Sequence, residues 1–198
     1  MLKEKFETLC RSFSQDEELI SKLWEEIKTF HTKENRYYHT LQHLEHIYKE
    51  LEVFELIPYL EFAIFYHDII YDTSCNNNEE QSALLCTKRL LQLNVPTALI
   101  KKVILLIHET KTHKASSITN ALFLDADLAI LGAKNYKAYI IGVQKEYAIY
   151  DTATYFRGRK EFLKSFLEKE KIYMTKHFHT KYDKKARVNM LIEYNSLT

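Results

Sequence analysis

The chain contains few residues that interrupt regular structure, since its 198 residues include only three glycines and two prolines. Glycine and proline mark most turns, while leucine, lysine and glutamate favour helices, so this composition predicts helices joined by few turns. The length suits one domain with a sizeable core. We therefore expect a single all-α domain over residues 1–198, a bundle of about eight to ten helices.

Cysteine and long apolar runs are also scarce. The three cysteines, Cys10, Cys75 and Cys86, form no C-x-x-C pair. Their odd number argues against a disulfide framework and against a thiolate zinc site. No apolar run approaches the roughly 20 residues needed to cross a bilayer, and the N-terminus lacks a signal-peptide apolar region. We therefore expect a soluble, cytoplasmic protein with no membrane partner.

The net charge is +1, but the charge is unevenly distributed. Residues 157–187 contain eleven Lys or Arg and four Asp or Glu, a net charge of +7, so the rest of the chain carries −6. A basic segment of this kind is often only a solvated helical face, but it can also attract phosphorylated molecules. The predicted partner is a small phosphorylated substrate, possibly a nucleotide. Nucleic acid stays a second candidate, and the oligomeric state does not follow.

Apolar periodicity divides the chain into helices. Ser14 and Glu17 form a capping-box pattern before a helix that ends near Phe30. Pro58 suits the first turn of a helix that holds the apolar run as far as Tyr71, and a loop rich in asparagine follows. Further helices are expected over residues 41–51, 78–93, 96–110, 122–131, 136–150, 160–173 and 184–197. We expect a core with the functional site at about 35–132 and C-terminal packing helices at about 134–198.

Two side chains that commonly ligate metals, His67 and Asp68, lie within an apolar run over residues 60–71. Ionisable groups are rarely buried in such a run unless they pair with a charge or coordinate a metal. Their presence in this predicted helix therefore indicates a metal site.

Other parts of the chain offer further ligands. Positions 39, 43 and 46 are histidines with the spacing of one helix face. Asp125 and Asp127 point to different sides of a helix, so at most one of them can share a given metal, and spacing leaves the choice open. A site of two histidines and two aspartates suits Mn, Fe, Co, Ni or Zn. We expect a divalent metal ion, with Mg as a further candidate.

The ordered set His43, His67-Asp68 and Asp127 resembles the H...HD...D signature of the HD-domain metal-dependent phosphohydrolases. More narrowly, five blocks look like a bacterial subfamily of predicted HD phosphohydrolases of unknown substrate: residues 36–43, 67–72, 78–83, 125–132 and 186–189. The resemblance covers most of the chain. It implies an HD-domain-like helical bundle, hydrolysis of a phosphomonoester or phosphodiester, and a metal held by His43, His67, Asp68 and Asp127.

The resemblance also implies a general acid. In cyclic-nucleotide phosphodiesterases a histidine one turn before the first ligand donates a proton to the leaving oxygen, and His39 has that position here. The chain departs from that motif at one position, because it has Thr40 where the motif has asparagine. The context Ala-Asp-Leu favours Asp127 over Asp125 as the ligand, and Asp125 is then a candidate to orient a ligand histidine.

The remaining expected roles concern proton transfer and substrate binding. Asp68 or Glu79 can accept the proton of an attacking water. Tyr71 stands where phosphodiesterases have another histidine, a departure that argues against a second metal unless His113 or Glu79 supplies a ligand. Substrate contacts are expected from four side chains, with Arg159 as another candidate cation. The four are Arg36, Tyr71, His113 and Arg157.

Two other functions fit the same residues. Some HD-fold proteins are di-iron oxygenases, which carry out redox chemistry at a binuclear site. A non-catalytic module that binds a metal or a nucleotide would retain its ligand without turnover. Metal content and dependence on O2 distinguish the first from a hydrolase, and the absence of any turnover distinguishes the second.

Overall fold

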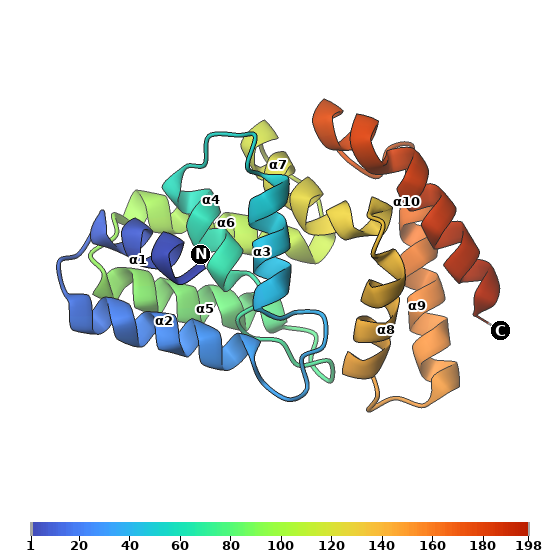
Figure 1. Ribbon diagram of the computed structural model, residues 1–198, viewed down its shortest axis with the longest axis horizontal. Helices are drawn as coiled ribbons and strands as arrows, with labels where there is room; N and C mark the ends of the chain where they lie inside the picture. The colour runs from blue at the N-terminus through green and yellow to red at the C-terminus, as the bar shows by residue number, and fades with distance from the viewer. Residues whose placement is uncertain (1, 198) are drawn as a thin grey trace.

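The computed structural model describes residues 2–197, and over this range the chain is all-α, as predicted. It contains ten α-helices, one 3-10 helix and no strand within these residues. In chain order (Figure 1) they are α1 (Leu2–Arg11), α2 (Glu17–His31), α3 (Leu41–Glu50), α4 (Pro58–Tyr66), α5 (Asn78–Gln92), α6 (Thr97–Thr112), α7 (Ile118–Asp127), η1 (Leu128–Gly132), α8 (Tyr136–Glu146), α9 (Thr152–Leu167) and α10 (Lys176–Ser196).

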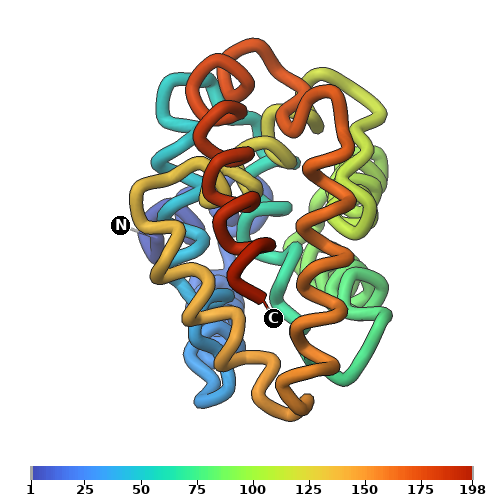
Figure 2. The backbone as a smooth tube through the Cα atoms, turned by 90° about the vertical axis from the view of Figure 1, so that its right-hand side faces the viewer, coloured from blue at the N-terminus to red at the C-terminus, as the bar shows by residue number. Residues whose placement is uncertain are grey.

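Helices α1 to α7 gather in one part of the molecule, and α8, α9 and α10 lie along one side of it (Figure 1). Figure 2 views that side, where the three C-terminal helices run next to one another. Helix α10 packs against both α9 and η1. No helix in the described part of the chain is long and apolar enough to cross a membrane.

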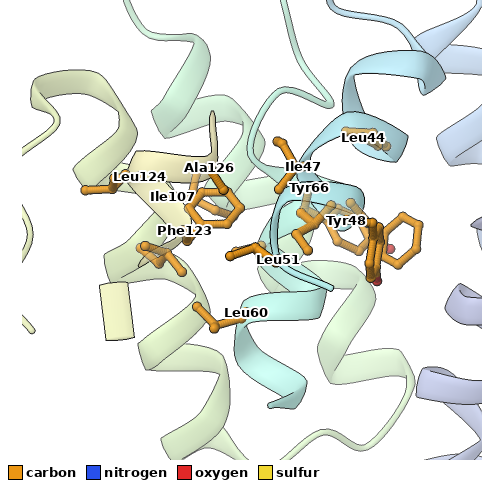
Figure 3. Close-up of a cluster of buried hydrophobic side chains, with 14 of the residues drawn as sticks. Leu44, Ile47, Tyr48, Leu51, Leu60, Tyr66, Ile107, Phe123, Leu124 and Ala126 are labelled. Atoms are coloured by element: carbon orange, nitrogen blue, oxygen red, sulfur yellow. The ribbon is translucent and has the colours of Figure 1, made fainter. Parts of the chain in front are cut away.

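Helix α4 lies at the centre of the fold. It begins at Pro58, which suits a first turn because proline has no backbone N–H that would need an acceptor there. Its residues 62–66 are fully buried. It contacts α1, α3, α5, α6 and α7, and a helix buried on all sides has an apolar sequence throughout. Figure 3 shows part of this core, in which Leu44 and Ile47 of α3 lie near Tyr66 of α4.

The prediction that α4 continues to Tyr71 is wrong, because the helix ends at Tyr66. The guanidinium of Arg36 donates hydrogen bonds to the backbone carbonyls of Asp68 and Ile69 at 2.7 and 2.8 Å. Those carbonyls would accept bonds from residues further along if the helix continued. Because these carbonyls accept hydrogen bonds from Arg36, the pair His67-Asp68 lies in a turn after the helix.

Several other helix starts also differ from the prediction. Asp16, not Ser14, caps α2 by accepting a hydrogen bond from the backbone N–H of Leu19. Helix α9 begins at Thr152, eight residues before the expected start, because Asp151 accepts a hydrogen bond from the backbone N–H of Thr154. Helix α10 likewise begins at Lys176 instead of residue 184.

Gly132 allows α10 to approach η1 closely. A Cβ atom at this position would lie 2.7 Å from Cβ of Tyr182 and 2.8 Å from its carbonyl oxygen. Contacts this short would force the two elements apart, so a glycine is needed where they cross. This crossing holds the C-terminal helices against the part of the chain that carries the predicted ligands.

Candidate metal centre

Three predicted ligands, His43, His67 and Asp68, form a group that can hold a metal ion. Their facing atoms are close together: Nε2 of His67 lies 3.2 Å from Nε2 of His43 and 3.1 Å from Oδ2 of Asp68. Nε2 of His43 lies 3.7 Å from the same carboxylate oxygen. Both histidines are buried, at 3 % and 1 % exposed, so these atoms do not face bulk water.

The end of α4 sets the orientation of His67. Nδ1 of its ring lies 3.1 Å from the carbonyl of Ile64 and 3.2 Å from that of Ala63. Because a carbonyl can only accept, Nδ1 carries the proton in the neutral ring and Nε2 is left with a free lone pair. Backbone contacts of this kind are typical of histidines that ligate metals.

Asp127, at the end of α7, also faces this group. Its Oδ1 lies 3.2 Å from Nε2 of His43 and 3.8 Å from Nε2 of His67. Ligand atoms bound about 2.0–2.2 Å from one cation lie roughly 3–3.5 Å from their neighbours, close to the separations found here. The role of Asp127 as a ligand stays a prediction, and its position suits that role. We refer to His43, His67, Asp68 and Asp127 as the metal centre.

Asp125 has a different environment. Its carboxylate accepts hydrogen bonds from the backbone N–H groups of Met174 and Thr175 and from the Thr175 hydroxyl. Burial raises its pKa, although these hydrogen bonds oppose the shift. The expectation that Asp125 orients a ligand histidine is therefore wrong. Its carboxylate holds the segment before α10 instead.

The electrostatics of the metal centre favour a positive charge. Burial disfavours the charged form of His67, but the neighbouring carboxylates of Asp68 and Asp127 outweigh it and raise the pKa of His67 to about 9. The pKa values of both carboxylates are lowered in turn, despite their burial, chiefly by the histidines around them. A divalent cation would gain from the same two negative charges.

His39 lies beside the metal centre but outside α3. The expected helix face with three histidines is wrong in this respect, because α3 begins at Leu41 and His39 belongs to the preceding turn. Its Nε2 lies 3.8 Å from Oδ2 of Asp68, and its ring stacks on Tyr71 with centroids 4.0 Å apart. His46, one turn beyond His43, is not part of the metal group.

Glu146, at the end of α8, is a residue that the sequence analysis missed. One of its oxygens lies 2.7 Å from Nδ1 of His39, and the other accepts backbone hydrogen bonds from residues 37, 38 and 39. Burial lowers the pKa of His39, but Glu146 and Asp68 reverse that effect and raise it overall. The contact spans 107 residues of sequence, and no local motif indicates it.

A cavity of about 520 Å³ opens beside the metal centre. Tyrosines of α8, α9 and the segment between them form much of its remaining wall. Seven residues that were predicted for the site line it: His39, Asp68, Tyr71, Glu79, His113, Asp127 and the candidate cation Arg159.

His113 reaches the cavity through an uncommon backbone conformation. It ends α6 with a φ of 51°, in the left-handed region that few residues other than glycine adopt. Its Nε2 lies 3.4 Å from Oδ2 of Asp127. The turn therefore places the imidazole of His113 next to the metal centre, in addition to that of His39.

Two predicted substrate contacts lie elsewhere. Arg36 is 6 % exposed and does not line the cavity, because its guanidinium holds the carbonyls of His39, Asp68 and Ile69. Arg157 is exposed and borders a different hollow with Lys160. The positions of these two arginines argue against the substrate contacts predicted for them.

The chain was compared with profiles of protein families, with curated proteins and with solved structures, and nothing matches in any of the three comparisons. The family resemblance therefore rests on the motifs in the sequence. The site itself indicates its chemistry through its geometry. Two imidazole nitrogens and two carboxylates meet at one side of a cavity large enough for a small organic molecule.

Proposed function

We propose that this protein is a metal-dependent phosphohydrolase of the HD type, which cleaves a small phosphomonoester or phosphodiester, with nucleotides among the candidates. The observation that carries the proposal is the convergence of His43, His67, Asp68 and Asp127 beside the cavity. These residues come from three separate parts of the chain. Their order matches the motif that first suggested the family.

The metal centre would hold one divalent cation through the Nε2 atoms of His43 and His67 and the carboxylates of Asp68 and Asp127. When bound, such a cation lowers the pKa of a coordinated water and neutralises charge on phosphoryl oxygens. The protein's own contribution begins with His67, whose backbone contacts direct its free lone pair at the site.

His39 is the proposed general acid. Glu146 accepts a hydrogen bond from Nδ1–H of His39 and stabilises the charged imidazolium, so that Nε2 carries a proton toward the cavity. In the reaction, an oxygen–phosphorus bond forms from water and the bond from phosphorus to the organic oxygen breaks. His39 then donates its Nε2 proton to the leaving oxygen.

A carboxylate would take the proton of the attacking water. Asp68 has one oxygen directed at both ligand histidines, and Glu79 lines the cavity. Oε2 of Glu79 also lies 3.4 Å from Nζ of Lys111. Either residue can accept a proton, and the effect of replacing each one by its amide would separate the two roles.

The test combines metal analysis with a panel of phosphate esters. Purified protein is expected to retain about one divalent metal per chain and to hydrolyse at least one phosphomonoester or phosphodiester. His67→Ala and Asp68→Ala should lose the metal and lower kcat/KM by about 10³-fold or more. His108→Ala is a matched control, because this histidine is exposed and lies outside the cavity lining.

Three results would contradict the proposal. Equal hydrolysis by the wild type and both site variants would show that the activity arises elsewhere. Two bound irons with activity that depends on O2 would favour the oxygenase. Tight retention of metal with no turnover of any ester would favour a binding module.

A further inference from the structure

The wall of the cavity contributed by α8, α9 and the segment between them is aromatic. We call this set the aromatic wall: Tyr139, Tyr147, Tyr150, Tyr155 and Phe162. The rings of Tyr147 and Tyr150 are nearly parallel, with centroids 6.2 Å apart and an interplanar angle of 28°. The wall therefore offers aromatic faces at the same cavity as the metal centre, and such faces suit a flat apolar group.

The cavity has little capacity for negative charge beyond the metal centre. Among the described residues that line it, Arg159 is the one Lys or Arg side chain. Its guanidinium already donates to both oxygens of Glu193 and to the hydroxyl of Tyr139. Among the same lining residues, Glu79 is the one carboxylate outside the metal centre, so no lining Lys or Arg is free to balance the added charge of a ligand with several phosphates.

Gly158 leaves part of the cavity open. It lies inside α9, where glycine destabilises a helix relative to alanine, and it lines the cavity. A Cβ atom built at this position would have no other atom within 4 Å. At Gly132 and Gly142, in contrast, such an atom would contact Tyr182 and Tyr38. Close packing therefore explains the other two glycines, whereas Gly158 is exposed, lines the cavity and has open space around it.

We propose that the cavity selects phosphate esters with a single phosphoryl group and a flat aromatic organic group, which lies between the aromatic wall and the backbone at Gly158. The position of the phosphoryl group at the metal centre rests on the proposed function. Gly158 then determines the size of the organic group that can bind. Aliphatic phosphates would lack the aromatic contact, and polyphosphates would bring too much charge.

Calorimetry of the metal-loaded protein tests the selectivity through binding, independently of turnover. Phenyl phosphate is expected to bind about tenfold more tightly than glycerol 2-phosphate, because only the first has an aromatic ring. Adenosine monophosphate is expected to bind more tightly than adenosine triphosphate, which carries the same base with more charge. Equal affinities in the first pair, or the reverse order in the second, would overturn the proposal.

Variants at Gly158 test its part in the same assay. Gly158→Leu should fill the open space and weaken the binding of phenyl phosphate by about tenfold or more. The affinity for glycerol 2-phosphate should change little. Gly158→Ala is the matched control for helix formation. Tyr150→Leu, at a half-exposed part of the wall, should also weaken phenyl phosphate selectively and serves if Gly158→Leu does not fold. Unchanged phenyl phosphate binding in the folded variants would contradict the assignment.

Hydrolysis assays on the same samples separate this inference from the proposed function. Selective binding of phenyl phosphate without turnover would support the selectivity of the cavity and contradict the hydrolase. Turnover of phenyl phosphate and glycerol 2-phosphate with equal kcat/KM, unaffected by Gly158→Leu, would support the hydrolase and overturn the selectivity.

Discussion

The metal centre and the aromatic wall line the same cavity but are assembled differently. The metal centre uses residues from short motifs, with His67 and Asp68 adjacent in sequence and His43 and Asp127 on neighbouring helices. The aromatic wall depends on how α8 and α9 pack along the rest of the chain. Chemistry that needs particular atoms at short range is therefore visible as a motif, whereas the shape of the cavity is not.

Glu146 joins these two regions. It belongs to α8, yet its carboxylate organises the turn at residues 37–39 beside the metal centre. Gly142, one turn earlier on α8, packs against Tyr38, where an added Cβ would lie 3.1 Å from the Cβ of that tyrosine. Helix α8 therefore orients His39 and also supplies part of the aromatic wall.

The largest effect is expected from a variant that removes the ion pair between Glu146 and His39. Glu146→Gln keeps the shape of the side chain but removes the charge that favours protonated His39, so kcat should fall about 10²–10³-fold with bound metal unchanged. His39→Gln should have a similar effect, and the double variant should be little worse than either single one because the two residues act as a unit. Full additivity in steady-state kinetics, or loss of metal from Glu146→Gln, would show that Glu146 has only a structural role.

A second prediction concerns the metal centre alone: its affinity for metal should depend on pH. In the metal-free protein the pKa of His67 is raised to about 9, so its ring holds a proton below that pH. Metal binding must release this proton, and metal affinity should therefore fall about tenfold for each unit that the pH drops below 9. Titration with Zn²⁺ at several pH values measures the slope. Affinity independent of pH between 6 and 8 would be inconsistent with His67 as a ligand.

The smallest expected effects come from a matched pair of glycine variants. Gly132→Ala should lower the free energy of unfolding by about 1–3 kcal/mol, because the added methyl group overlaps Tyr182. Gly158→Ala should raise it by about 0.5–1 kcal/mol, because alanine favours a helix and the space is open. Urea unfolding monitored by circular dichroism compares the two. A loss of stability in Gly158→Ala would mean that this position is packed and not part of an open cavity.

The sequence by itself was enough to predict the fold class and the group of His43, His67 and Asp68. Few glycines and prolines, together with apolar periodicity, are local properties that determine helices. Metal ligands are similarly restricted to a few residue types, so their pattern remains visible without coordinates. Helix ends were predicted less well, because the end of α4 depends on Arg36, which lies more than thirty residues away.

Only the tertiary structure decided how the remaining residues are used. Arg36 was expected to bind substrate, but burial directs its guanidinium to backbone carbonyls. Asp125 and Asp127 differ by two positions, and the packing of α7 turns one to the segment before α10 and the other to His43. Glu146 and Gly158 carry no local signal at all. Their roles arise from contacts between distant segments, and those contacts exist only once the helices have packed.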